Sequence, residues 1–371
     1  MRNIQFLGPM PDPFRKPDGS IMTKEEWYAQ RQTLRDFVVD HEFGGMPPMP
    51  EVVTGTPINT FHRGHIANWF RICAGSHQRQ VTFYLELYLP EEKDCPENGK
   101  APVLLTCDRC YANLESDTIA EALARGYAVG LFNRLELATD CPDDRSGGLY
   151  EVYPEHTGFT AMSAWAWGFI ACMDFFTQFP YVDAEQVGVT GHSRGGKTAM
   201  LAAVVDERIR YCCPNNSGCH GAVSHRTYVT NQGEQENVTE RLGNMLDMFP
   251  HWMGEKLTPY RDREQDLPYD MHYFGALIAP RYYLQCEGMQ DYWINPIGSW
   301  QNLMAVKACF KRLGCEDHVG GWFRPGQHRQ KYPDFIQFID FMDRARAGLP
   351  LSEHLQINPY PDVPKNFSWG E

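Results

Sequence analysis

The sequence lacks the clustered lysines and arginines that nucleic-acid binding requires. Its 371 residues include 34 Lys and Arg but 47 Asp and Glu, which gives a formal net charge of −13 at pH 7. Proteins bind nucleic acids chiefly by neutralising phosphates with clustered cations. The acidic balance therefore argues against nucleic acid as the main partner, while a hydrophobic content of 43% is enough to bury a large core.

Long apolar runs and regularly spaced cysteines are also missing. The longest uncharged stretch, residues 157–173, is shorter than the roughly 20 residues that cross a membrane, so we expect a buried helix and no membrane partner. The first residues show no apolar stretch followed by small residues, which predicts cytoplasmic action for the chain as given; a removed leader would instead imply a secreted or periplasmic protein. Twelve cysteines without a repeated spacing predict reduced, mostly buried thiols.

Short apolar strands alternate with helical segments along most of the chain, which is typical of the α/β class. Strict alternation of apolar and polar residues over 81–89 predicts a half-buried strand, antiparallel at one side of the sheet. We therefore predict a mostly parallel central sheet with helices on both faces. The other expected strands are 102–106, 127–132, 187–190, 210–213 and 281–286, and the expected helices are 116–125, 160–178, 195–205, 298–313 and 333–346.

We predict a single domain over residues 1–371, because no linker rich in glycine, serine or charge divides the chain. A capping-box pattern that begins at Thr23 predicts a helix over 23–41 within an N-terminal helical extension of residues 1–50. Residues 217–279 form a longer insertion with an amphipathic piece over 238–248 and several aromatic residues. We expect this insertion to be a partial lid.

Ser193 is the candidate nucleophile. It is the serine of a Gly-x-Ser-x-Gly motif at 191–195, which follows the expected strand 187–190 and opens the expected helix 195–205. In that setting a sharp turn raises the serine hydroxyl above the edge of an α/β-hydrolase sheet. The alternative, a phosphate-binding turn, would need a Walker or dinucleotide glycine spacing that this turn does not have. The motif therefore predicts a serine-dependent ester hydrolase.

A serine nucleophile needs a base and an orienting acid, which in this fold follow in the order Ser, Asp or Glu, His. Asp291, just beyond the strand 281–286, is the first candidate for the acid, and Glu287 is its competitor. Of the histidines after Asp291, His328 lies in a loop directly before the last helix. The predicted triad is Ser193, Asp291 and His328.

Attack by the serine creates an oxyanion that needs hydrogen-bond donors already in place. The backbone N–H of Arg194, the residue after the nucleophile, is one predicted donor. The second should come from the loop 107–111, whose donating amide stays open. Cys107 and Cys110 of that loop have the Cys-x-x-Cys spacing, but without a second pair or a redox motif they are predicted to be packing thiols.

Neither a metal nor another cofactor is predicted for this chemistry. The chain has 13 histidines, including His62 and His65, which could suggest a metal-dependent hydrolase. However, it contains no His-Glu-x-x-His or comparable helix of ligands. The triad is expected to act alone on a small-molecule or carbohydrate ester.

The elbow at 189–197 resembles that of the glucuronoyl esterases and their bacterial relatives, described as dienelactone-hydrolase-like or acetyl-xylan-esterase-like. That family couples the serine to an adjacent arginine and a lysine four residues on, as Arg194 and Lys197 do here. The resemblance covers most of the chain, and segments 164–168, 267–272, 279–281 and 291–293 match in order and spacing. It implies that the Arg194 guanidinium assists the oxyanion, and that Lys197 and Trp293 bind a uronic-acid sugar.

The chain departs from the family pattern at two positions. His192 stands where the elbow usually has cysteine, and Asn216 stands where many members have a catalytic glutamate. Asn216 cannot act as a carboxylate, so it is counted with the substrate-binding residues and Asp291 is expected to supply the acid. The resemblance implies a glucuronoyl ester as substrate; an acetylated xylan, a small lactone, or carbohydrate binding without catalysis stay open as alternatives.

Overall fold

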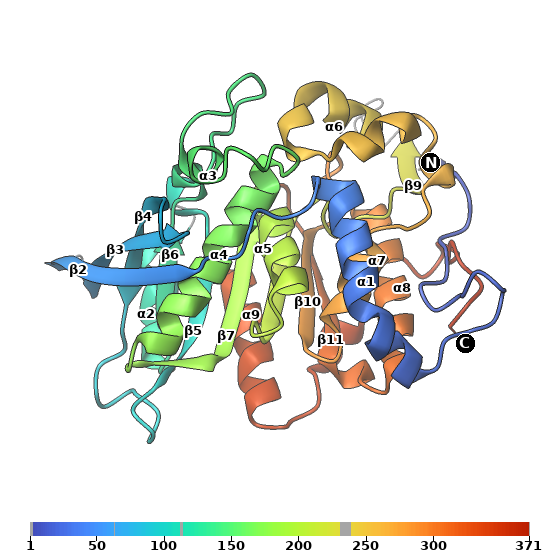
Figure 1. Ribbon diagram of the computed structural model, residues 1–371. Coiled ribbons are helices and arrows are strands. Elements are labelled where there is room, and N and C mark those ends of the chain that lie inside the picture. Colours follow the sequence, from blue (N-terminus) through green and yellow to red (C-terminus); the bar gives the residue numbers. More distant parts are fainter. Residues whose placement is uncertain (1–2, 63, 112–113, 231–238, 371) are drawn as a thin grey trace.

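A nine-stranded sheet forms the centre of the molecule (Figure 1). The computed structural model describes residues 3–62, 64–111, 114–230 and 239–370. The strands follow the spatial order β11, β10, β8, β7, β5, β6, β4, β3, β2. Their bounds are Val52–His62 (β2), Ile66–Gly75 (β3), Gln80–Tyr88 (β4), Ala101–Thr106 (β5), Ala128–Phe132 (β6), Val182–His192 (β7), Tyr211–Asn215 (β8), Tyr282–Gly288 (β10) and Val319–Arg324 (β11).

Six of these strands, from β11 to β6, run parallel, and β4, β3 and β2 continue the sheet in antiparallel pairing. This arrangement confirms the predicted mostly parallel sheet with the strand over 81–89 at its antiparallel side. Parallel strands are covered on both faces, which explains why β5 and β6 are buried along their whole length and apolar except for Thr106. Their parallel pairing also brings the carboxyl ends of β5, β7, β8 and β10 to one edge.

Helices cover both faces of the sheet, as predicted. Five helices pack on one face, where their side chains join the larger hydrophobic cluster, and two pack on the other (Figure 1). The first group is α1 (Lys24–Phe43), α4 (Ala161–Gln178), α5 (Arg194–Val205), α7 (His272–Ile278) and α8 (Pro296–Leu313), and the second is α2 (Ser116–Ala124) and α9 (Tyr332–Arg346). Within the described ranges, no helix combines the length and apolar character needed to span a membrane.

The N-terminal extension is anchored to the insertion 217–279. Helix α1 begins with the predicted capping box, in which Thr23 and Glu26 bond reciprocally, and ends at Gly44 in a left-handed conformation (φ 69°). Before it, the short strand β1 (Asn3–Phe6) pairs antiparallel with β9 (Thr227–Thr230) of the insertion. The insertion also contains α6 (Leu242–Met248), within the predicted amphipathic piece; Val238 of that piece lies outside the described residues.

Candidate active site

Ser193 occupies a sharp turn between β7 and α5. It has φ 56° and ψ −121°, and a positive φ is unusual for a residue with a side chain. The two glycines of the motif make this turn fit. A Cβ atom on Gly191 would overlap the backbone of Gly195, and one on Gly195 would overlap the carboxylate of Asp108. The motif therefore has the strand, turn and helix that a nucleophile elbow requires.

Neighbouring strand ends hold the elbow from both sides. The N–H of Ser193 donates to Asn215 O at the end of β8 over 2.9 Å. On the other side, the N–H of His192 donates to Asp108 Oδ2 over 2.6 Å, just beyond β5. Asp108 is buried in an ion pair with Arg134. The predicted oxyanion loop after β5 thus packs directly against the serine turn.

The structure brings together the predicted acid and base at this edge of the sheet. Asp291 follows β10, and His328 follows β11, next to β10 in the sheet. His328 Nδ1 lies 2.6 Å from Asp291 Oδ2, and the Asp291 side chain is only 4% exposed while that of His328 is 39% exposed. The imidazole is therefore oriented by a buried carboxylate and still reachable from solvent.

Glu287, the alternative acid, has a different partner. It is fully buried in β10 and accepts a hydrogen bond from Ser299 Oγ over 2.7 Å. Burial raises the pKa of Glu287 well above its usual value, against a smaller opposing effect of the Ser299 bond. Burial therefore favours the neutral form of Glu287, and no contact joins it to His328 among the residues described.

Asn216 has a role that the sequence did not reveal. Its side chain is fully buried, and its Nδ2 donates to Asp291 Oδ2 over 2.6 Å. The same oxygen thus accepts from Asn216 and from His328. The described contacts of the Asn216 side chain thus lead to the acid, and its contact with substrate stays a prediction. This contact depends on the adjacency of β8 and β10, which the sequence pattern does not reveal.

His192 lies beside His328, with ring centroids 4.3 Å apart. Its Nδ1 lies 2.9 Å from Asn215 Oδ1, so the neutral ring donates there. Burial, together with the neighbouring His328, lowers the pKa of His192 to about 4. The residue that departs from the family pattern therefore adds a neutral ring next to the base at ordinary pH.

Two neighbouring side chains hold the side chain of Arg194, the residue after Ser193, in place. It pairs with Asp140, and its guanidinium lies 4.7 Å from the centre of the Trp252 ring. Asp140 also accepts from Trp252 Nε1 over 2.8 Å and bonds with His251 Nε2 over 3.0 Å. Burial alone would raise the pKa of Asp140, but these three partners outweigh it and lower the pKa to about 2. The insertion thus helps to fix the arginine.

Lys197 and Trp293, the predicted substrate-binding residues, are linked through Glu240. The Lys197 side chain is 1% exposed, and its Nζ donates to Ser217 O over 2.5 Å and to Glu240 Oε2 over 3.3 Å. The N–H of Glu240 donates to Trp293 O over 2.7 Å. Glu240 was missed by the sequence analysis, since no motif marks it. Trp293 is only partly buried and remains open to a ligand.

Comparison with known proteins places this architecture in a family. A family model described as "Glucuronyl esterase, fungi" matches residues 72–314. The chain belongs to the glucuronoyl esterase family. It is accordingly an ester-hydrolysing enzyme with an α/β-hydrolase fold.

Curated relatives and solved structures agree with this family. A 4-O-methyl-glucuronoyl methylesterase of Schizophyllum commune is 29% identical over 318 residues, which cover 84% of this chain and 75% of that protein. A carbohydrate esterase of an unknown prokaryotic organism is 29% identical over 252 residues, 62% of this chain and 56% of that protein. The solved glucuronoyl esterase of carbohydrate esterase family 15 from Caldicellulosiruptor kristjansonii has a TM-score of 0.81 and 26% identity, covering 96% of this chain and 97% of that chain.

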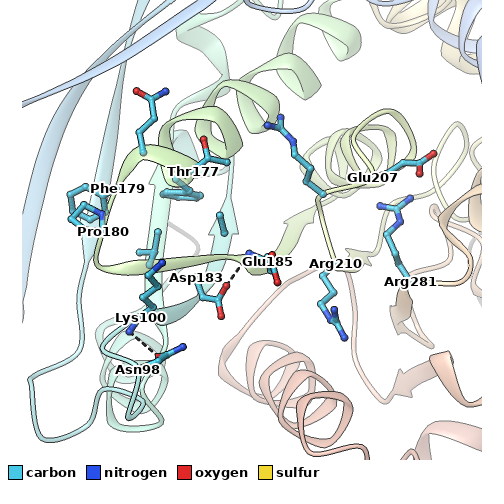
Figure 2. Close-up of a pocket in the computed structure, with 15 residues that line it drawn as sticks. Asn98, Lys100, Thr177, Phe179, Pro180, Asp183, Glu185, Glu207, Arg210 and Arg281 are labelled. Atoms are coloured by element: carbon cyan, nitrogen blue, oxygen red, sulfur yellow. Dashed lines mark hydrogen bonds between the residues drawn. The ribbon is translucent and has the colours of Figure 1, made fainter.

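A large hollow of the esterase lies at the starts of the parallel strands, opposite to the strand ends that carry the elbow (Figure 2). It has a volume of about 980 Å³ and is lined by Val182, Arg210 and Arg281, which lie at or just before the starts of β7, β8 and β10. Ser193 and Asp291 follow the ends of β7 and β10. This hollow is therefore remote from the elbow, and its size does not mark it as the catalytic site.

Proposed function

We propose that this enzyme hydrolyses esters of glucuronic acid through Ser193, His328 and Asp291. The observation that carries the proposal is the 2.6 Å contact between His328 Nδ1 and Asp291 Oδ2, at the sheet edge where the elbow holds Ser193. Membership of the glucuronoyl esterase family supports the substrate class. So does the printed name of the Schizophyllum relative, a 4-O-methyl-glucuronoyl methylesterase.

In the proposed mechanism, Ser193 Oγ attacks the carbonyl carbon of the ester while His328 Nε2 takes the hydroxyl proton. Asp291 stabilises the imidazolium that forms. His328 then passes the proton to the leaving alcohol, and the uronoyl group remains bound to Ser193. Water attacks this acyl-enzyme with His328 again as base, which releases the uronic acid and regenerates the serine.

Arg194 is proposed to stabilise the oxyanion in two ways. Its backbone N–H begins α5, where an N–H has no partner within the helix and is free to donate. Its guanidinium, fixed by Asp140 and Trp252, supplies a positive charge at the same place. A cation held in position before the reaction needs little reorganisation in the transition state.

Lys197, Glu240 and Trp293 are proposed to form the wall that receives the sugar. An ion pair supplies a donor and an acceptor for hydroxyl groups, while an indole offers an apolar face to a pyranose ring. Lys197, four residues after Ser193, lies on the first turn of α5, and its partner Glu240 comes from the insertion. The insertion 217–279, which carries Glu240 and Trp252, is proposed to act as a partial lid within a single domain.

A comparison of substrates tests the proposed function. The purified full chain is assayed with a methyl ester of glucuronic acid, acetylated xylan and a short nitrophenyl ester. We expect the uronate ester to be cleaved with the highest kcat/KM and Ser193→Ala to abolish that activity. Cleavage confined to the other two substrates would reject the uronate assignment. Absence of all three activities, together with no labelling of Ser193 by a fluorophosphonate, would instead indicate a carbohydrate-binding protein.

The state of the cysteines bears on the compartment in which the enzyme acts. All twelve cysteines are free, eight of them buried. Because disulfides are rare in reducing compartments, we propose that the enzyme acts in the cytoplasm on imported fragments. Fractionation of the source cells tests this, and recovery of the protein outside the cytoplasmic fraction would contradict it.

A further inference from the structure

A second cluster of titratable side chains lies away from the proposed triad. Glu42 comes from the last turn of α1, while His220 and His225 come from the segment after β8. Each offers one potential ligand atom, and these atoms all lie within 4.8 Å of one another. All three side chains are 0% exposed. Both imidazoles face one oxygen: Glu42 Oε1 contacts His220 Nδ1, and it lies 3.1 Å from His225 Nε2.

The charge of Glu42 needs compensation. Within the described part of the chain, its carboxylate has no lysine or arginine partner. The nearby Arg226 pairs with Asp270 instead. A carboxylate removed from water is costly unless a cation or a metal ion neutralises it. The positive charge here must come from a protonated imidazole or from a bound cation.

Two of the three side chains, Glu42 and His225, have the supporting contacts that are typical of metal ligands. Ligating groups usually bond through their other polar atoms to neighbours that fix their orientation. Tyr269 OH donates to the second oxygen of Glu42 over 2.5 Å, and Cys219 Sγ lies 3.6 Å from Nδ1 of His225. Glu42 Oε1 and His225 Nε2 are thus left to face the centre of the cluster.

The backbone of His220 has an unusual conformation. It adopts φ 63°, a left-handed conformation that is unfavourable for a residue with a Cβ. Its Nε2 is buried without a hydrogen-bond partner in the described structure. At Nδ1 the ring contacts Glu42, on the side where His225 also converges. A ligand bond at Nδ1 would account for the strained placement.

We propose that Glu42, His220 and His225 bind one divalent transition-metal ion, for which Zn²⁺ is the probe. Two imidazoles and a carboxylate are a donor set that suits zinc and its first-row neighbours. Because the site is buried, the ion has a structural role and joins α1 to the segment 217–226. Sequence motifs do not show this set, since Glu42 lies far along the chain from both histidines.

The proposed ion also supports the wall that receives the sugar. Cys219, between the metal ligands and β8, donates its N–H to Glu240 Oε2 over 2.8 Å. Glu240 in turn pairs with Lys197. Fixing the segment 217–226 therefore fixes Glu240. The proposed metal ligands share no residue with the proposed triad. Failure of ester hydrolysis would therefore leave the metal site untouched, and absence of the metal would leave the triad untouched.

Metal analysis of the full chain is the first test. The protein is produced in zinc-supplemented medium, purified without a metal-affinity column and analysed by inductively coupled plasma mass spectrometry. We expect about one zinc per chain, because the three ligands come together at a single buried site. His225→Gln should reduce the content to background, whereas His272→Gln, a control at another fully buried histidine, should retain it. A metal-free wild-type protein, or zinc retained by His225→Gln, would overturn the proposal.

A second test avoids variants that fail to fold. Wild-type protein is dialysed against a chelator, and its thermal midpoint Tm is measured before and after Zn²⁺ is restored. We expect removal of the ion to lower Tm by roughly 5 °C or more, since ligand binding stabilises the folded state. Ser193→Ala should hold as much zinc as the wild type, whether or not it has activity. An unchanged Tm on both chelation and zinc addition would contradict the inference.

Discussion

Asp291 has two donors on a single oxygen, and this sharing makes its charge the most sensitive feature of the proposed triad. In Asp291→Asn, the amide keeps the shape but no longer stabilises an imidazolium and favours the wrong tautomer of His328. We expect kcat to fall about 10³ to 10⁴-fold with a small change in KM, as when the acid of a serine triad becomes an amide. Steady-state kinetics on the uronate ester measure the effect.

Glu287→Gln is the matched control for this substitution. Burial favours the neutral form of Glu287, and glutamine keeps an oxygen that can accept the hydrogen bond from Ser299. We expect its kcat to stay within about threefold of the wild type, because the change removes no contact with His328. A loss as large as that of Asp291→Asn would mean that the acid has been assigned to the wrong carboxylate.

Three elements meet at Arg194, and their meeting gives a prediction about positioning. The loop that carries Asp140 and the insertion that carries Trp252 hold a guanidinium that belongs to the first turn of α5. Asp140→Asn removes the charge that fixes this group. We expect kcat to fall about 10-fold, less than the loss of an oxyanion donor itself, because the arginine remains present but is less well positioned.

Asp144→Asn serves as the control for this element. Asp144 follows Asp140 in the same loop; among the described residues its carboxylate bonds only to Ser146, and the residue is partly exposed. Its substitution should leave kcat and KM unchanged within error. If both variants lose activity equally, the effect would reflect the loop as a whole and not the clamp on Arg194.

Elements with a clear sequence pattern were predictable, and elements without one were not. Helix α4 is apolar on all sides and was predicted almost to the residue, because a helix surrounded by core needs no polar face. Strand β2 was missed. It is the edge of the sheet and is mostly exposed over its second half, so no period of two marks it. Strand β11 was missed because it begins with Gly320 and Gly321 after its first valine.

The same distinction applies to the site. Ser193, Asp291 and His328 each follow a strand, and the fixed order of the fold allowed them to be proposed from the chain alone. Asn216, Asp140 and Glu240 make contacts between segments that no motif connects. Such contacts require the order of the strands and the path of the insertion, which are properties of the folded molecule.

Stability of the whole molecule should depend on pH because two histidines are buried in neutral form. Burial is the leading cause that lowers the pKa of His192 and of His272 from 6.5 to about 4. As pH falls from 6.5 towards 4, the unfolded chain binds protons at these positions and the folded chain does not. These two histidines should therefore lower the free energy of unfolding over this window, by up to about 3 kcal/mol each.

Replacement of one histidine isolates its share of this loss. His192→Gln keeps a polar side chain near Asn215 but cannot bind a proton in this range. We expect the variant to lose less stability than the wild type between pH 7.5 and pH 4.5, by about 2 kcal/mol, when urea unfolding is followed by tryptophan fluorescence. Equal losses in both proteins would show that His192 is protonated in the folded state. The assignment of a neutral ring beside His328 would then be wrong.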